Sequence, residues 1–136
     1  MRRYRLIEHT ADTGLIAYGN TLKEAYENAG IGLFSIITDL KKLREAESRT
    51  IELNENDADS LLFEWMNSLI YLFDVDKLLF KRFDIIGLDE SHLKAICHGE
   101  RYDPSRHILN TSVKSATYHM LKVDKDKNRV QVIFDI

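Results

Sequence analysis

The chain of 136 residues lacks the features of secreted, disordered or membrane-spanning proteins. It contains one cysteine, Cys97, which excludes an intrachain disulfide and is typical of a reducing compartment. A single proline and six glycines leave little room for flexible linkers. No apolar run approaches the roughly 20 residues that span a bilayer, and the basic N-terminus lacks the apolar stretch of a signal peptide. We therefore expect a cytoplasmic protein without membrane association.

The sequence also lacks an excess of positive charge. It carries 19 Lys and Arg against 22 Asp and Glu, a formal net charge of -3 at pH 7. Proteins that bind nucleic acid through its phosphates usually carry clustered Lys and Arg. This balance argues against a large RNA-binding face, and any contact with RNA is expected to be indirect, through a protein partner. The length predicts one domain over residues 1–136.

Periodic apolar residues are present and predict the secondary structure. They recur at helical spacing over 21–39 and 57–76, which are the two predicted helices. The predicted strands are 3–9, 13–19, 48–56, 78–88, 92–102, 107–123 and 129–136. Helices do not alternate with every strand, so a parallel sheet is not expected. The sequence predicts an α+β fold, a two-layer sandwich with two main helices packed on one face of an antiparallel or mixed sheet.

Local signals refine both helices. Thr21 and Glu24 stand at the spacing of a capping box, which predicts that the first helix begins there. Gly30 and Gly32 weaken the middle of this helix and predict close packing against another element. The second helix has a broad stripe of aromatic, Met and aliphatic residues, which we interpret as core rather than as a ligand pocket.

Two polar stretches mimic metal or catalytic sites without matching them. Asp124 and Asp126 resemble the start of a calcium loop, but Arg129 stands where the sharp turn needs glycine, so we predict a hairpin loop. Cys97 and His98 do not have the spacing of a structural zinc site with His107. No nucleophile elbow surrounds the serines near the histidine at position 119, which argues against a catalytic triad.

Two further stretches keep both a structural and a functional interpretation. In HTAD, residues 9–12, Asp12 can stabilise a turn or bind a metal. At the C-terminus, VQVIFDI alternates to its last residue, and Asp135 stands beside the carboxylate of Ile136. Like charges held together are unfavourable unless a cation or a cationic side chain compensates them, and hard oxygen donors suit Ca²⁺, Mg²⁺ or Mn²⁺. The alternative is a solvated, frayed end.

Three separated motifs then resemble the archease family across essentially the whole chain. They are IEHTADTGLIAYGNTLKEAYENAGIGLFSIITD, VKSATYHMLKV and the terminal VQVIFDI. Thr13 replaces the aliphatic residue usual after HTAD, and Met120 stands where a glycine is common in the family. Neither departure touches the polar residues of the motifs.

The resemblance implies an accessory protein rather than an enzyme. Archeases activate the GTP-dependent RNA ligase that joins 3′-phosphate or 2′,3′-cyclic phosphate ends to 5′-hydroxyls in tRNA splicing, by promoting guanylylation and multiple turnover. The resemblance implies a divalent cation, Ca²⁺ first with Mg²⁺ or Mn²⁺ as alternatives, bound by Asp12, Asp135 and the carboxylate of Ile136. It also implies ligase activation through Lys114, with both aspartates. The alternatives are an independent metal-dependent phosphoester hydrolase and a metal-free, chaperone-like binding module.

Overall fold

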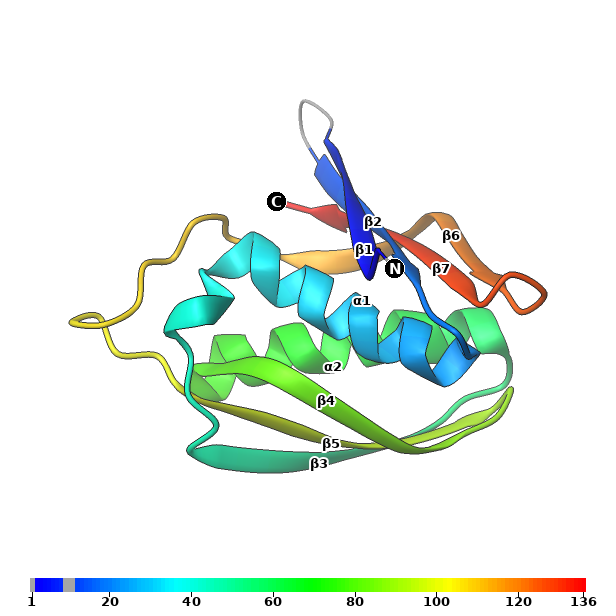
Figure 1. Ribbon diagram of the computed structural model, residues 1–136. Coiled ribbons are helices and arrows are strands. Elements are labelled where there is room, and N and C mark those ends of the chain that lie inside the picture. Colours follow the sequence, from blue (N-terminus) through cyan, green and yellow to red (C-terminus); the bar gives the residue numbers. More distant parts are fainter. Residues whose placement is uncertain (1, 9–11) are drawn as a thin grey trace.

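The computed structural model describes residues 2–8 and 12–136, which form seven strands, two α-helices and a short 3-10 helix (Figure 1). The strands are β1 (Tyr4–Glu8), β2 (Asp12–Tyr18), β3 (Glu47–Asn54), β4 (Leu78–Leu88), β5 (His92–Arg101), β6 (Ser115–Asp124) and β7 (Arg129–Asp135). The helices are α1 (Leu22–Ile37), η1 (Leu40–Lys42) and α2 (Ala58–Asp76). No helix in the described ranges has the length and apolar character that crossing a membrane requires. His9 of the HTAD stretch lies outside the described residues.

The α+β class, the antiparallel pairing and the two main helices are confirmed, but the layering differs from the prediction. The described strands divide into two sheets, ordered β1-β2-β7-β6 and β3-β5-β4, and the helices lie between them (Figure 1). A single sheet with helices on one face was therefore the wrong arrangement. The reason is that α1 is buried on more than one side, and it contacts both β2 and β4. A helix buried in this way needs a covering layer on each side.

The first helix begins at the predicted cap, Thr21, and the second begins at Asp57. The hydroxyl of Thr21 accepts a hydrogen bond from the N–H of Glu24 at 3.1 Å, while the Glu24 carboxylate accepts one from the N–H of Asn20 at 3.1 Å. The carboxylate of Asp57 accepts from the N–H of Ser60 at 2.8 Å and starts α2. These bonds satisfy N–H groups that the first helical turn leaves without a partner.

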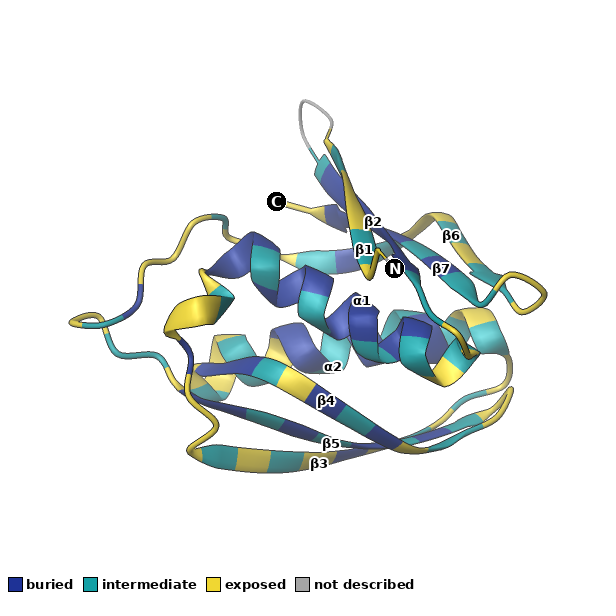
Figure 2. Ribbon diagram, viewed as in Figure 1, coloured by how far each residue is buried: buried dark blue, intermediate teal, exposed yellow. Residues whose placement is uncertain are grey.

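The core lies around the helices, where the predicted close packing is confirmed (Figure 2). Trp65 of α2 is fully buried, and its indole N–H donates to the carbonyl of Tyr26 at 3.0 Å. Phe34 of α1 stacks with Phe83 of β4 at 6.2 Å between ring centroids. A Cβ at Gly30 would lie 2.8 Å from the Phe83 ring, so only glycine lets α1 approach β4 this closely. The stripe on α2 is therefore core.

The strand predicted over 107–123 begins late, at Ser115. Residues 102–114 instead form a long connection that is bound to the end of α1. The hydroxyl of Thr38 donates to the carbonyl of Ile108 at 2.7 Å, and the N–H of Asn110 donates to the carbonyl of Ile37 at 2.8 Å. Ile108 is 75% exposed although it belongs to the apolar pattern. The prediction was wrong because these backbone groups pair with α1, 70 residues earlier in sequence, rather than with a strand.

Candidate functional site

One end of the four-stranded sheet brings together the residues that the sequence singled out. Asp12 of β2 lies directly opposite Asp135 of β7, and Asp135 lies opposite Ser115 of β6. Directly opposite residues of an antiparallel pair have Cα atoms about 4.5–5.5 Å apart and side chains on the same face. Lys114 precedes β6, and its N–H donates to the carbonyl of Asp135 at 2.8 Å. Ile136 follows Asp135 immediately.

The carboxylate of Asp12 has an unusual environment. Its Oδ1 is buried and has no hydrogen-bond partner among the residues that the structure describes. Asp135, a second acid, lies opposite it on the same face of the sheet. A buried polar atom without a partner costs free energy, and two neighbouring negative charges add to that cost. Hard oxygen donors in this arrangement fit a divalent cation. Such a cation would give the buried oxygen a partner and would neutralise the two negative charges.

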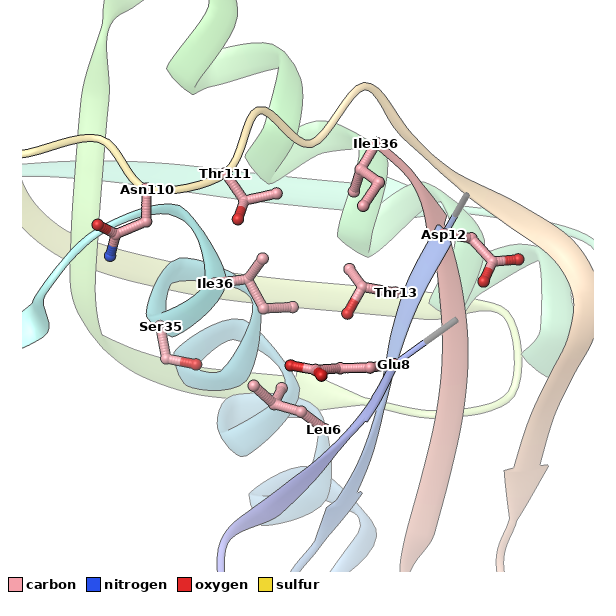
Figure 3. A pocket seen from close by; sticks show the side chains of 9 residues that line it. All are labelled: Leu6, Glu8, Asp12, Thr13, Ser35, Ile36, Asn110, Thr111 and Ile136. Atoms are coloured by element: carbon pink, nitrogen blue, oxygen red, sulfur yellow. The ribbon is translucent and has the colours of Figure 1, made fainter. Parts of the chain in front are cut away.

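A hollow of about 370 Å³ lies at the same end of the sheet (Figure 3). It is lined by Leu6, Glu8, Asp12, Thr13, Ser35, Ile36, Asn110, Thr111 and Ile136. Figure 3 shows the side chains of Glu8 and Thr13 on one side of the hairpin and that of Asp12 on the other, as the alternation of a strand requires. The hollow therefore joins the sheet end, the last turns of α1 and the connection 102–114.

The side chain of Thr13, noted above as a departure from the motif, is mostly buried and hydrogen-bonded. Its side chain is 8% exposed, and its hydroxyl donates to the carbonyl of Ile7 on β1 at 3.3 Å. A hydroxyl in a mostly buried position is tolerated when it is hydrogen-bonded. The hydroxyl of Thr13 is therefore satisfied in the wall of the hollow.

Ser35, Asn110 and Thr111 also line the hollow, and the sequence reasoning did not identify them. Ser35 belongs to a helix that was interpreted only as core, and Asn110 and Thr111 belong to the segment that was predicted as a strand. No local pattern places residues 110 and 111 beside α1. The hydrogen bond between Asn110 and Ile37 does so, and it is visible only in the structure.

A cluster around Glu100 anchors the connection that leads to Lys114. The Glu100 carboxylate accepts hydrogen bonds from the guanidinium of Arg106 at 2.8 and 3.1 Å and from the N–H of Arg44 at 2.8 Å. His107 Nε2 lies 3.0 Å from the same carboxylate. The bonds from Arg106, with those from Arg44 and His107, lower the pKa of Glu100 to about 2 against the effect of burial.

The role of His107 in this cluster can be assigned. Its Nδ1 accepts a hydrogen bond from the N–H of Asp103 at 2.9 Å. Nδ1 therefore carries no proton, and Nε2 donates to Glu100. Cys97 and His98 have different surroundings: burial raises the pKa of the Cys97 thiol to about 12, and His98 Nε2 lies 2.9 Å from a carboxylate oxygen of Asp84. The three residues considered for zinc thus belong to separate environments.

The predicted hairpin loop at residues 124–128 is confirmed, since it joins the antiparallel strands β6 and β7. Asp124 accepts a hydrogen bond from the N–H of Lys127 at 3.2 Å and pairs with Arg129 at 3.4 Å. Within residues 2–8 and 12–136, no group of three or more His, Cys, Asp or Glu side chains is arranged to bind a metal ion. At the sheet end, Asp12 and Asp135 are therefore a pair of carboxylates rather than a group of three such side chains.

Comparisons with known proteins match the chain over nearly its whole length. The model of the Archease protein family matches residues 4–136. Protein archease of Methanosarcina acetivorans is 39% identical over 141 residues, which cover 99% of this chain and 97% of the relative. Protein archease of Sulfurisphaera tokodaii is 37% identical over 130 residues, which cover 94% and 93%.

Two solved structures share the fold. The solution structure of protein 1598 from Methanobacterium thermoautotrophicum has a TM-score of 0.81 and 31% identity, with both chains covered completely. The crystal structure of an archease from Thermotoga maritima, described as a possible chaperone, has a TM-score of 0.57 and covers 96% and 94% of the two chains. At 20% identity, this second likeness concerns the fold alone.

Proposed function

The chain belongs to the archease family, and we propose that it activates a GTP-dependent RNA ligase without being an enzyme itself. The ligase joins 3′-phosphate or 2′,3′-cyclic phosphate ends to 5′-hydroxyls in tRNA splicing. The proposed contribution of this chain is to promote guanylylation of the ligase and so sustain multiple turnover. The observation that carries the proposal is the pair of carboxylates at one sheet end. Asp12 lies opposite Asp135, and its buried Oδ1 has no hydrogen-bond partner among the residues that the structure describes.

The first part of the proposal concerns a divalent cation. Asp12, Asp135 and the carboxylate of Ile136 would hold it, with Ca²⁺ expected first and Mg²⁺ or Mn²⁺ as alternatives. The support is chemical: these donors are hard oxygens, and their mutual repulsion needs compensation. A bound cation supplies positive charge that can orient phosphate oxygens.

The second part concerns the contact with the ligase. Lys114 is exposed, and its N–H is bonded to the carbonyl of Asp135, so the residue lies next to this end of the sheet. Its ammonium group would offset phosphate charge of the ligase's nucleotide. The Glu100 cluster orders the connection that ends at Lys114. With a net charge of -3, the chain is suited to a protein partner and contacts tRNA only indirectly.

A ligase turnover assay tests this proposal. Asp12→Asn, Asp135→Asn and Lys114→Ala should each lower the stimulation by about tenfold or more, equivalent to about 1.4 kcal/mol. The matched control is Asp126→Asn, an exposed aspartate in the turn between β6 and β7. Normal stimulation by all three variants would show that the site assignment is wrong. Loss with Lys114→Ala alone would favour a metal-free, chaperone-like module.

A chain extension tests the role of Ile136 separately. One residue added after Ile136 moves the free carboxylate away from Asp12 and Asp135, so Ca²⁺ affinity measured by calorimetry should fall while the circular dichroism spectrum stays unchanged. Unchanged affinity would remove Ile136 from the proposed ligands. Hydrolysis of a phosphoester by the purified protein alone would support the rival hydrolase.

A further inference from the structure

The four edge strands of the two sheets differ in how they are protected. β4 carries two register shifts, and the carboxylate of Glu27 accepts a hydrogen bond from the N–H of Ile85 at 2.8 Å. β6 has a register shift between Thr117 and Lys122, where Met120 has a φ of 57°. β1 has only five residues. Bulges, short strands and covering side chains all discourage pairing with another chain.

β3 has none of these protections. It has eight residues, and its register with β5 runs without a shift from Glu47 to Asn54. On its other side, the described part of the chain provides no strand partner. The backbone groups along this edge are therefore available to an additional strand.

A hollow of about 550 Å³ lies along this open edge. On one side it is lined by the consecutive residues 50–53 of β3. Because successive side chains of a strand point to opposite faces, a hollow lined by four consecutive residues faces the edge itself. On the other side it is lined by α2 residues that share one helix face: Glu64, Asn67, Ser68, Tyr71 and Leu72. An extended segment placed there would contact both β3 and α2.

The hollow combines apolar contact area with negative charge. Tyr71 is 59% exposed although it is aromatic, and Ile51 and Leu53 line the same hollow. The charged residues of the lining are Glu52 and Glu64, and none of its nine described residues is Lys or Arg. The hydrogen bond from the His92 ring lowers the pKa of Glu52, so this carboxylate is ionised at neutral pH. The complementary ligand is basic.

We propose that the β3 edge and the facing side of α2 bind an extended segment of a partner protein in which basic and apolar residues alternate. Its backbone adds a fourth strand beside β3, its apolar side chains lie against α2, and its basic side chains lie beside Glu52 on the other face. Glu64 contributes a second negative charge from α2. This surface belongs to the three-stranded sheet, whereas the two aspartates belong to the four-stranded sheet, so the inference does not depend on the proposed function.

The test uses the full chain, labelled for NMR, and a capped synthetic peptide of alternating Lys and Val matched in length to β3. We expect chemical-shift changes and slowed amide exchange over 47–54 and along the α2 face. A peptide of alternating Glu and Val should bind at least about tenfold more weakly, because its carboxylates replace the ammonium groups beside Glu52. The same Lys–Val peptide with N-methylated backbone amides should lose binding, because it cannot donate to the edge.

Protein variants separate this site from non-specific charge attraction. Glu52→Lys combined with Glu64→Lys should weaken Lys–Val binding by about tenfold or more, and the control Asp126→Lys should leave it unchanged. Unchanged binding to the double variant, or equal binding of the N-methylated peptide, would overturn the proposal. Sedimentation of the free chain measures its oligomeric state and tests whether a second copy occupies the β3 edge. A dimer whose amide protection maps to β3 would identify a second copy as the occupant and would also overturn it.

Discussion

Two carboxylates, those of the buried Glu100 and the half-buried Asp12, differ in what surrounds them. Glu100 accepts hydrogen bonds from a guanidinium, a ring N–H and a backbone N–H, and its pKa is lowered to about 2. Asp12 has a buried oxygen without a partner among the described residues, and it faces Asp135. A carboxylate whose partners are all supplied by the fold stabilises the fold. A carboxylate whose partner is missing is a candidate for binding.

The largest expected change in stability comes from removing the carboxylate of Glu100. Glu100→Ala should lower the free energy of unfolding by about 3 kcal/mol at pH 7, because it leaves Arg106 and His107 without their shared acceptor. Urea denaturation measures this loss. The control is Glu90→Ala, whose side chain is 75% exposed and should change stability by no more than about 0.5 kcal/mol. Equal effects of the two variants would mean that the cluster does not anchor the connection.

The pH dependence of stability should reflect the ionisation of Glu100. The pKa of Glu100 is lowered from 4.5 to about 2 in the folded state, so its contribution is fully present above about pH 4.5. It is lost as the pH falls from about 4.5 towards 2, and a shift of this size corresponds to about 3 kcal/mol. Glu100→Gln should therefore show a shallower decline of stability across this window than the unmodified chain. Parallel curves for the two proteins would contradict the assignment.

Replacing the carboxylate of Asp12 should have a smaller effect on stability, and of opposite sign. Asp12→Asn removes the repulsion with Asp135 and should raise the free energy of unfolding by about 0.5 kcal/mol in the presence of EDTA. In saturating Ca²⁺ the unmodified chain should be the more stable of the two. Its free energy of unfolding would rise by about 2.7 kcal/mol when the Ca²⁺ concentration is 100 times the dissociation constant. Thermal unfolding with and without Ca²⁺ measures both. A destabilisation as large as that of Glu100→Ala would make Asp12 a structural anchor instead.

The smallest effect concerns the backbone of β6, which belongs to neither carboxylate site. Met120 has a φ of 57°, a conformation that costs an L-residue about 1–2 kcal/mol, and its side chain is 55% exposed. Met120→Gly should therefore be more stable than Met120→Ala by about 0.5 kcal/mol, after the extra chain entropy of glycine is subtracted. Chemical denaturation of the two variants measures the difference. Greater stability of the alanine variant would show that the bulge relaxes without strain.

Much of the local structure was predictable from periodicity and capping. The second helix was expected over 57–76 and is observed over Ala58–Asp76, because its cap and apolar stripe are encoded by neighbouring residues. The hairpins were predictable for the same reason, since each is formed by strands adjacent in sequence. The φ of 57° at Met120 lies in the region that favours glycine, which agrees with the glycine that the resemblance led us to expect at this position.

The candidate site was predictable only in part. The motifs at both ends of the chain singled out Asp12, Asp135 and Lys114, and the register of β2, β7 and β6 places them at one sheet end. The hollow beside them was not predictable, because Asn110 reaches α1 through a backbone hydrogen bond to Ile37. A bond between distant segments leaves no periodic signal in either segment.

The sequence by itself determined the α+β class, the two helices, the hairpins and the family, since these depend on local spacing and on contiguous motifs. Only the tertiary structure decided that the strands divide into two sheets around the helices, that Glu100 is satisfied while Asp12 is not, and that β3 is the unprotected edge. The physical reason is that each of these depends on which distant groups become partners. That choice is made by packing around α1 and α2 rather than by the residues nearest in the chain.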